Sequence, residues 1–501
     1  MRFKNAVRNS VVAFVGQLLN VFLGFGVRTL FIRYLSKEFL GVNGVMESMI
    51  TLLSVTELGL GTSIAFALYA PVNSGDEKHI CSLMNFYKKT YRVIGIATIV
   101  LGAVLVPFMR FFAKEATSVP HLNLIYIIFL ANTALSYFFS YKRTLLNAYQ
   151  ENYITSLCED IFAVVKYIVQ AVVLVVLNSY IGYLVTNLVF NFASNALISA
   201  VCSKRHPVAS EYKDEKLSSE DKALLKKSVV SLMFQKVGGS LVNGTDNLMI
   251  SYVGIALMGV YSNYSMIISI IERVVNNVMR SLVGSVGNLM VQRDADHKYK
   301  VYEEFAFTTF CLFFFISAVL AGCMERFIAL WAGSDWVLSP NVTFVVIMNF
   351  FLQGTRHPNI AIIDTAGLFN KIRPKAVFEV LVNLVVSFLF LVVFDMGIYG
   401  VLFGTTVSKL GVCIWWEAWA VHKYSFEMSL SVYAVKYLKS AAVTAAGCFA
   451  SYYIAGALPV GGFAGLVLAG LVSAFVCIAL VLIVYGRSHE FRGMTARLVK
   501  R

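Results

Sequence analysis

Long apolar segments alternate with short polar ones along the whole chain. Most apolar segments exceed about 20 residues, the length that a helix needs to cross a bilayer. We therefore predict fourteen membrane-spanning helices, with both chain ends on the cytoplasmic side. The predicted spans cover residues 9–33, 42–71, 91–112, 121–141, 152–177, 180–202, 229–253, 256–289, 303–330, 338–365, 375–395, 398–420, 431–455 and 462–486.

The polar segments predict how these spans are grouped. The longest, residues 203–228, is charged throughout and reads as a cytoplasmic linker. It separates an expected N-terminal six-helix bundle, 1–202, from a second six-helix bundle, 229–421. Residues 422–501 add two further helices and a basic cytoplasmic tail. The expected fold is an all-α membrane protein with two pseudo-symmetric bundles and two C-terminal helices.

An internal repeat supports the two related bundles. Residues 10–40 align without a gap with residues 228–258, at a shift of 218 positions. In this alignment Arg28 falls on Asp246, so the two halves carry opposite charges at equivalent depths. Identical pairs are Gln17 with Gln235, Gly26 with Gly244, Leu30 with Leu248, Tyr34 with Tyr252, and Gly41 with Gly259.

Composition and charge are typical of an integral membrane protein. Only 14% of the residues are charged, against roughly 25% in soluble domains. The net charge of +14 comes from short loops on the predicted cytoplasmic side, as membrane topology requires, so we expect no nucleic-acid partner. The eight cysteines lack metal-binding spacing, and we expect no metal site. The first apolar segment is too long for a cleavable signal and should remain in the protein.

Polar and charged side chains recur at helical spacing inside several spans. A cation in mid-membrane costs about 2.5–3.5 kcal/mol, so such side chains should face protein or water. We interpret these stripes as the lining of a water-filled cavity. The alternative is a set of interhelical pairs, for example Arg28 with Asp246. The cavity candidates are the cations Arg28, Lys236, Arg273, Arg280 and Arg356 and the amides Gln17, Asn20, Asn243 and Asn277.

The excess of cations in these spans favours an anionic substrate. Arginine suits phosphate because its planar guanidinium donates two hydrogen bonds to one group. Three carboxylates, Glu57, Asp246 and Asp364, are candidates for coupling or gating. No phosphate-binding nucleotide loop occurs, so we expect no cofactor and consider coupling to H⁺, Na⁺ or the membrane potential.

Several motifs resemble those of one transporter family. Residues 40–72 contain an acidic-Gly-x-Gly element, and residues 349–387 contain AGLF with Glu379 and Asn383. These are followed by GIYGVLFGTTVS and by Glu417 before HKYSF. The chain resembles the Wzx-type oligosaccharide flippases of the polysaccharide transporter family, in the multidrug/oligosaccharidyl-lipid/polysaccharide (MOP) exporter superfamily, and specifically their Gram-positive branch. It departs from that pattern at Ala418, where proline is expected.

The resemblance implies an alternating-access transporter of the bacterial plasma membrane and no enzymatic activity. The cargo would be a polyprenyl-diphosphate-linked oligosaccharide, moved to the outer leaflet for surface polysaccharide synthesis. Polysaccharide polymerases and glycosyltransferases would be partners. A lipid II flippase and a cation-coupled multidrug exporter remain as alternatives. A membrane glycan polymerase or ligase is disfavoured because the predicted external loops are short.

Overall fold

The computed structural model describes residues 2–57, 59–113, 116, 119–207, 215–290 and 295–499. Within these ranges all regular structure is helical, which confirms the all-α prediction. Ten helices are long and apolar enough to cross a membrane by length and composition. Each of the fourteen predicted spans coincides with one helix or with consecutive helical segments. The chain forms two compact units, Met1–Gly259 and Val260–Arg501.

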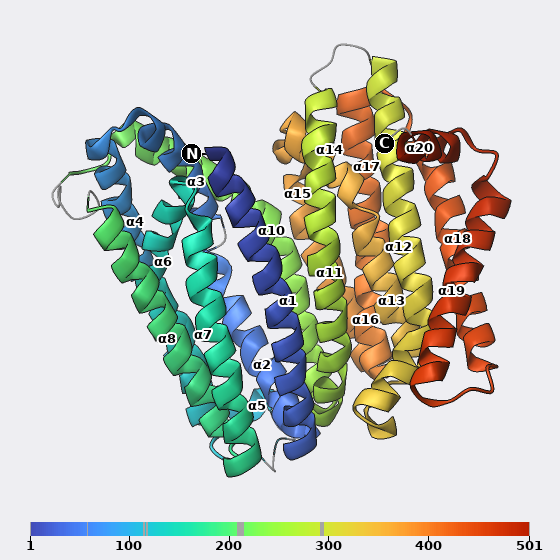
Figure 1. Ribbon diagram of the computed structural model, residues 1–501, viewed down its shortest axis with the longest axis horizontal. Helices are drawn as coiled ribbons and strands as arrows, with labels where there is room; N and C mark the ends of the chain where they lie inside the picture. Colours follow the sequence, from blue (N-terminus) through green and yellow to red (C-terminus); the bar gives the residue numbers. More distant parts are fainter. Residues whose placement is uncertain are drawn as a thin grey trace. The chain divides into compact units, whose positions relative to one another are not determined.

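Unit 1 is built from long helices that pack side by side (Figure 1). The pairs α1 with α7, α4 with α6 and α6 with α8 form its main contacts, while α10 packs on α2 and α3. The helices are α1 (Arg2–Tyr34), α2 (Lys37–Leu53), α3 (Leu60–Ser74), α4 (Glu77–Leu105), α5 (Met109–Phe112), α6 (Leu122–Ala148), α7 (Asn152–Val172), α8 (Tyr180–Arg205) and α10 (Ser219–Val253), followed by the start of α11 (Ile255–Met290).

The second predicted span of unit 1 is broken. Helix α2 ends at Leu53, a 3₁₀ turn covers Ser54–Glu57, and α3 begins at Leu60. Gly59 has a φ of 94°, a conformation that glycine adopts without steric cost. The break places the Glu57 carboxylate inside the bundle instead of along a continuous helix.

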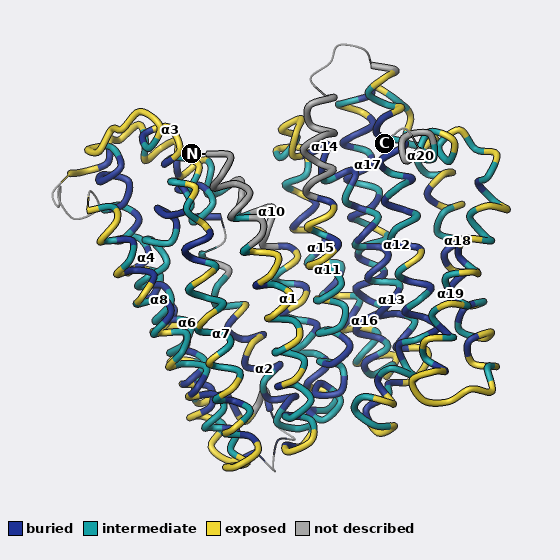
Figure 2. The backbone as a smooth tube through the Cα atoms, in the orientation of Figure 1, coloured by how far each residue is buried: buried dark blue, intermediate teal, exposed yellow. Residues whose placement is uncertain are grey.

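Unit 2 is organised around α12, which packs against α13, α18 and α19. In Figure 2 much of α12, α13 and α16 is buried, while the outer faces of α18 and α19 are exposed. The helices are α11, α12 (Ala295–Trp331), α13 (Pro340–Gly354), α14 (His357–Ala366), α15 (Phe369–Phe388), α16 (Gly397–Ser408), α17 (Ile414–Val421), α18 (Leu430–Gly456), α19 (Gly462–Tyr485) and α20 (His489–Val499); π-helical turns cover Val173–Leu177 in unit 1 and Leu389–Val393, Lys409–Cys413 and His422–Phe426 in unit 2.

The predicted division of the chain at 203–228 and near 421 stays a prediction. Helix α10, which the repeat assigns to the second bundle, packs on helices of unit 1. The C-terminal helices α18 and α19 lie beside α12, so the terminal addition is an integral part of unit 2.

The tenth predicted span is also broken, at Thr355 and Arg356. Helix α13 ends at Gly354 and α14 begins at His357. Pro358 stands in the first turn of α14, where its missing N–H is tolerated, but it could not have continued α13. The break directs the Arg356 side chain into unit 2, and the candidate site forms around it.

Candidate functional site

The guanidinium of Arg356 is held by a carboxylate from α17. Its Nε donates to Glu417 Oε2 at 3.0 Å, and its Nη2 donates to Glu417 Oε1 at 2.6 Å. Its Nη1 donates to Gln353 Oε1 at 2.8 Å. This two-bond contact between planar groups is the strongest geometry available to an arginine and a carboxylate. Both side chains are buried, with Arg356 6% and Glu417 2% exposed.

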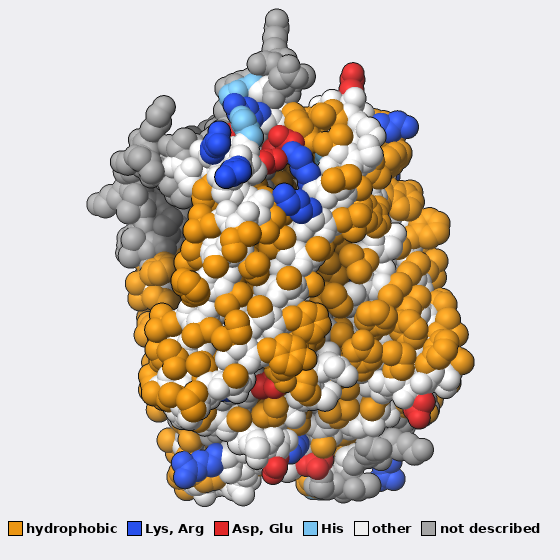
Figure 3. All heavy atoms as spheres, turned by 90° about the vertical axis from the view of Figure 1, so that its right-hand side faces the viewer, with side chains coloured by type: hydrophobic (Ala, Val, Ile, Leu, Met, Phe, Trp, Pro, Cys, Tyr) orange, Lys and Arg blue, Asp and Glu red, His pale blue; other side chains and the backbone are white. Residues whose placement is uncertain are grey.

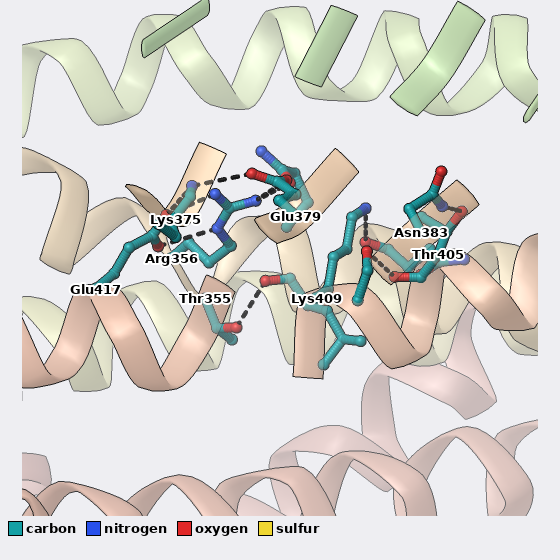
Figure 4. A network of polar contacts seen from close by, with 12 residues as sticks. Thr355, Arg356, Lys375, Glu379, Asn383, Thr405, Lys409 and Glu417 are labelled. Carbon is teal, nitrogen blue, oxygen red and sulfur yellow. Dashed lines mark hydrogen bonds and ion pairs between the residues drawn. The ribbon is translucent and has the colours of Figure 1, made fainter. Parts of the chain in front are cut away.

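Helix α15 adds a second cation and a second anion to this pair (Figure 4). Lys375 Nζ lies 2.8 Å from Glu417 Oε1 and 3.1 Å from Glu379 Oε2. Glu379 in turn approaches Arg356 Nη1 at 3.8 Å. Lys375 and Glu379 are four residues apart and so share one face of α15. The four side chains form a buried cluster with no net charge, which we call the ionic cluster.

A further lysine stands on the helical segment that precedes α17 in the chain. Lys409, on the π-helical turn after α16, donates to the carbonyl of Asn349 at 3.2 Å. Glu272 of α11 lies within electrostatic range of this ammonium group. Nearby, Asn383 Nδ2 donates to Thr405 Oγ1 at 3.0 Å between α15 and α16. Figure 4 shows these contacts beside the ionic cluster, as separate groups of polar side chains in unit 2.

For Arg356 the structure favours the interhelical-pair alternative over the open-cavity interpretation. Its charge is neutralised by Glu417, so it has little capacity left for a substrate phosphate. Lys375 was not among the predicted site residues, although its side chain is only 8% exposed inside the ionic cluster. The signal for this cluster was present in the sequence as two glutamates inside apolar spans, at 379 and 417.

Arg28 lies on α1 among aromatic and acidic groups of unit 1. The Glu47 carboxylate and the phenols of Tyr180 and Tyr183 are within electrostatic range of its guanidinium. Glu47 also accepts a hydrogen bond from Asn43 Nδ2 at 2.8 Å. Arg28 as a residue is partly buried.

Glu57 is surrounded by tyrosines. Tyr91 donates to its Oε1 at 2.7 Å, and Tyr137 donates to Ser54 Oγ at 3.0 Å on the same 3₁₀ turn. The Tyr87 and Tyr91 rings meet edge to face at 4.5 Å. Glu57 is thus tied to α4 at the break between α2 and α3.

The other predicted site residues lie apart from the ionic cluster. Asp246 is 5% exposed within unit 1, and the neighbouring Asn247 donates to Ser48 Oγ at 3.0 Å. Gln17 on α1 is partly buried. Exposed positions are occupied by Asn243 on α10, Arg273 and Asn277 on α11, and Asp364 on α14. The side chains of Lys236 and Arg280 lie outside the described residues.

A polar cavity of about 280 Å³ opens between α1, α6, α7 and α8 of unit 1. Asn20, a predicted cavity residue, donates from Nδ2 to Asp160 Oδ1 at 2.8 Å. Glu159 forms an ion pair with Arg143 in the same cavity, and Lys166 donates to Asn187 Oδ1 at 3.3 Å. Carboxylate and amide oxygens together can hold a proton or a hard cation.

Asp160 was missed as a site residue by sequence reasoning. It lies within the predicted span 152–177, where a carboxylate is a functional candidate by default. Its neighbour Glu159 pairs with Arg143 of α6. No cluster of three or more His, Cys, Asp or Glu side chains suited to a metal occurs among the described residues.

The arrangement of helices is that of the MOP superfamily transporters. The chain superposes on a multidrug resistance MATE family transporter in an inward-facing conformation with a TM-score of 0.67 and 13% identity, covering 84% of this chain and 98% of the other. It superposes on the lipid II flippase MurJ, in an inward closed conformation, with a TM-score of 0.63 and 12% identity, covering 96% and 99%.

A third structure of the same fold is a MOP superfamily transporter from Pyrococcus furiosus, described as having a binding pocket of reverse polarity. Here the TM-score is 0.56 at 12% identity, with 85% of this chain and 97% of the other covered. No family model matches the sequence, and no curated protein matches it. At these identities the likeness establishes the fold, and the structural neighbours are transporters and flippases.

Proposed function

We propose that the protein is a flippase for a polyprenyl-diphosphate-linked oligosaccharide, moved between leaflets of the bacterial plasma membrane by alternating access. The observation that carries the proposal is the extent of the structural match. The lipid II flippase covers 96% of this chain, and the drug transporter covers 84%. The remaining 16% amounts to about 80 residues, the size of the C-terminal addition at 422–501. A chain that the lipid II flippase matches over more of its length than the drug transporter does favours a lipid-linked cargo.

The charge pattern supports an anionic cargo. A cation-coupled exporter of cationic drugs needs acidic groups along its pathway, whereas the polar stripes here are rich in arginine and lysine. With Arg356 neutralised in the ionic cluster, the diphosphate would be met by Arg28 and Arg273 together with Lys236 and Arg280. The Pyrococcus transporter offers a precedent within the fold for a pocket of reversed polarity.

The ionic cluster serves as a rigid part of unit 2 in this proposal. Four buried charges with mutual partners resist separation, because each side chain left alone would be a buried unpaired ion. The cluster ties the break at Arg356 to α15 and α17, so that these segments would move as one body. Rocking of one bundle against the other would then expose the cargo site to either side.

We further propose that the polar cavity of unit 1 couples transport to H⁺ or Na⁺. Asp160 and Asn20 provide oxygen atoms within one cavity and lie on different helices, α7 and α1. Glu57, Asp246 and Asp364 are the other coupling or gating candidates. Polysaccharide polymerases and glycosyltransferases would act before and after the flippase on the same lipid.

Depletion of the protein in its host tests the cargo. We expect a complete polyprenyl-diphosphate oligosaccharide to accumulate in the cytoplasmic leaflet, measured by lipid extraction with a leaflet-specific probe. The sugars on that lipid would identify the cargo, and accumulation of lipid II itself would point to the lipid II alternative. Retention of cationic dyes without any lipid-linked sugar would replace the proposal with a drug exporter.

A further inference from the structure

A second cavity, of about 210 Å³, lies within unit 2 between α12, α18, α19 and α20. Aromatic side chains line most of it, and polar side chains gather at its mouth. Its apolar part is formed by Phe307, Phe310 and Tyr485. The cavity is separate from the ionic cluster and from the predicted substrate cations, and nothing in the proposed transport pathway uses it.

A buried histidine with an unused nitrogen lines this cavity. His422 is 1% exposed, and its Nδ1 lies 2.9 Å from the carbonyl oxygen of Ala418. Because a carbonyl only accepts, Nδ1 carries the proton of this hydrogen bond. In the described chain Nε2 of His422 has no hydrogen-bond partner. The neutral ring therefore presents a buried acceptor, which is costly unless a donor reaches it.

Aromatic rings surround this acceptor on several sides. Tyr302 and Tyr433 lie 5.6 Å and 5.3 Å from the imidazole, and Tyr299 lies 6.1 Å away, between ring centroids. The Tyr302 hydroxyl donates its hydrogen bond to Asn359 Oδ1 at 2.6 Å, so it does not donate to His422 Nε2. Tyrosine faces of this kind attract an ammonium group or cover an alkyl segment.

Two lysines of α18 line the cavity, and they differ in whether a carboxylate pairs with them. Lys436 bridges Glu303 at 2.5 Å and Glu490 at 2.7 Å, which uses both carboxylates. Lys439 faces the Tyr485 ring at 4.4 Å, and no carboxylate pairs with it in the part of the chain that the structure describes. Ser440 and Ser488 line the cavity nearby and add hydroxyl donors.

Helices α18 and α19, which contribute lining residues to the cavity, also carry exposed apolar side chains. Val435 and Leu438, on either side of Lys436, are 69% and 58% exposed, and Ile483 on α19 is 79% exposed. Figure 3 shows this face, with apolar side chains over most of it and acidic and basic groups near its upper and lower edges. An apolar belt bordered by charges is typical of a surface that meets acyl chains and headgroups.

We propose that this cavity binds a membrane phospholipid whose headgroup carries a hydrogen-bond donor, such as phosphatidylethanolamine. The headgroup donor reaches His422 Nε2 among the tyrosines, and the phosphate lies at Lys439. Acyl chain packs against Phe307 and Phe310. The headgroup donor would satisfy a buried acceptor that lacks a partner among the described residues, and the phosphate would meet a lysine that has no carboxylate partner there. The site does not depend on which cargo the protein carries.

Native mass spectrometry of the detergent-purified full chain tests the site. The protein is titrated with phosphatidylethanolamine and with phosphatidylcholine, which has the same phosphate but no donor in its headgroup. We expect phosphatidylethanolamine to bind about fivefold to tenfold more tightly, the effect of one buried hydrogen bond. Equal binding of the two lipids, or binding of neither, would overturn the proposal.

Two substitutions separate the roles of the residues. His422→Phe should abolish the preference for phosphatidylethanolamine, and Lys439→Gln should weaken both lipids by a similar factor of about ten. If His422→Phe does not fold, the two-lipid comparison and Lys439→Gln still decide the question. Lys423→Gln, at an exposed lysine outside the cavity, is the matched control and should change nothing.

Soluble probes separate a lipid site from a simple phosphate site. Glycerophosphoethanolamine and inorganic phosphate offer the headgroup or the phosphate without acyl chains. We expect both to bind at least tenfold more weakly than the lipid, because the aromatic part of the cavity stays unfilled. Binding of either probe as tightly as the lipid, or unchanged lipid binding in both variants, would refute the assignment.

Discussion

Gly41 and Gly259, which the repeat aligns with each other, make reciprocal contacts. A Cβ atom at Gly41 would lie 1.9 Å from the carbonyl oxygen of Ile255, and one at Gly259 would lie 2.1 Å from that of Lys37. Lys37 and Ile255 are also equivalent under the shift of 218 positions. The two contacts are therefore images of each other, and a local pseudo-two-fold axis passes between the glycines.

This close approach predicts that Gly41→Ala destabilises the protein. The added methyl group cannot fit without separating α2 from the start of α11, and overpacking of this kind costs about 1–3 kcal/mol. We expect a lower melting temperature in detergent. Gly26→Ala is the matched control, because nothing lies within 4 Å of its added Cβ. Equal melting temperatures for the two variants would show that the contact is not tight.

The ionic cluster predicts strong coupling between Arg356 and Glu417. Glu417→Gln leaves the guanidinium buried with one fewer anion, and breaking such a pair costs about 3–5 kcal/mol. Arg356→Gln should destabilise the protein by a similar amount, because it leaves the Glu417 carboxylate buried with one fewer cation. The double variant should recover part of the loss, since neither charge is then left alone. A double-mutant cycle on thermal stability measures this coupling, and strictly additive effects would contradict it.

The fold was predictable from the sequence because apolar length is a direct consequence of the bilayer. All fourteen predicted spans coincide with helical segments. The repeat aligned Gly41 with Gly259 but did not predict that the two positions meet. The breaks in the second and tenth spans were not predicted, although Gly59 and Pro358 are their local causes. Continuous hydrophobicity hides such breaks, since both halves of a broken span are equally apolar.

The site was harder to predict because a charge inside a span has two physical solutions. It can face water, or it can pair with an opposite charge on another helix, and periodicity does not distinguish them. Arg356 took the second solution with Glu417, a partner 61 positions away. Lys375 stands at the edge of an apolar segment. At such a position, a lysine in an exposed loop and a lysine in a buried ionic cluster have the same neighbouring sequence. Only tertiary packing settles such cases.

The proposed cargo pathway predicts that Arg273→Gln slows translocation. Arg273 is exposed on α11, and no ion pair involves it among the residues that the structure describes. Loss of one charge-assisted hydrogen bond to a diphosphate should reduce the rate about tenfold or more. The rate is measured in proteoliposomes with a polyprenyl-diphosphate oligosaccharide. Lys222→Gln, at an exposed lysine near the start of α10, is the control and should transport normally.

The polar cavity of unit 1 predicts that Asp160→Asn removes ion dependence. The amide keeps the size of the side chain but can neither release a proton nor carry the charge that attracts Na⁺. We expect downhill flipping to persist while stimulation by an imposed H⁺ or Na⁺ gradient disappears. Glu38→Gln, at a carboxylate outside this cavity, should keep the stimulation. An ion-stimulated Asp160→Asn variant would move the coupling role to Glu57, Asp246 or Asp364.

The bridge from Glu490 to Lys436 predicts how α20 is attached to unit 2. Burial raises the pKa of the Glu490 carboxyl, but the hydrogen bond from Lys436 and its positive charge outweigh burial and hold the pKa below its usual range. The attachment is therefore complete above the unfolded value of about 4.3 and is lost as the pH falls through the lower folded value. The protection factor of the α20 amides, which is their intrinsic exchange rate divided by the observed rate at the same pH, should be high at pH 7 and should fall in acid. Glu490→Gln should accelerate exchange already at pH 7, by a factor of about five or less, because a partly exposed bridge contributes only about 0.2–1 kcal/mol.

Glu427→Gln, at an exposed glutamate of unit 2, is the control. Exchange that is equally slow in both variants would mean that packing against α12 alone holds the helix.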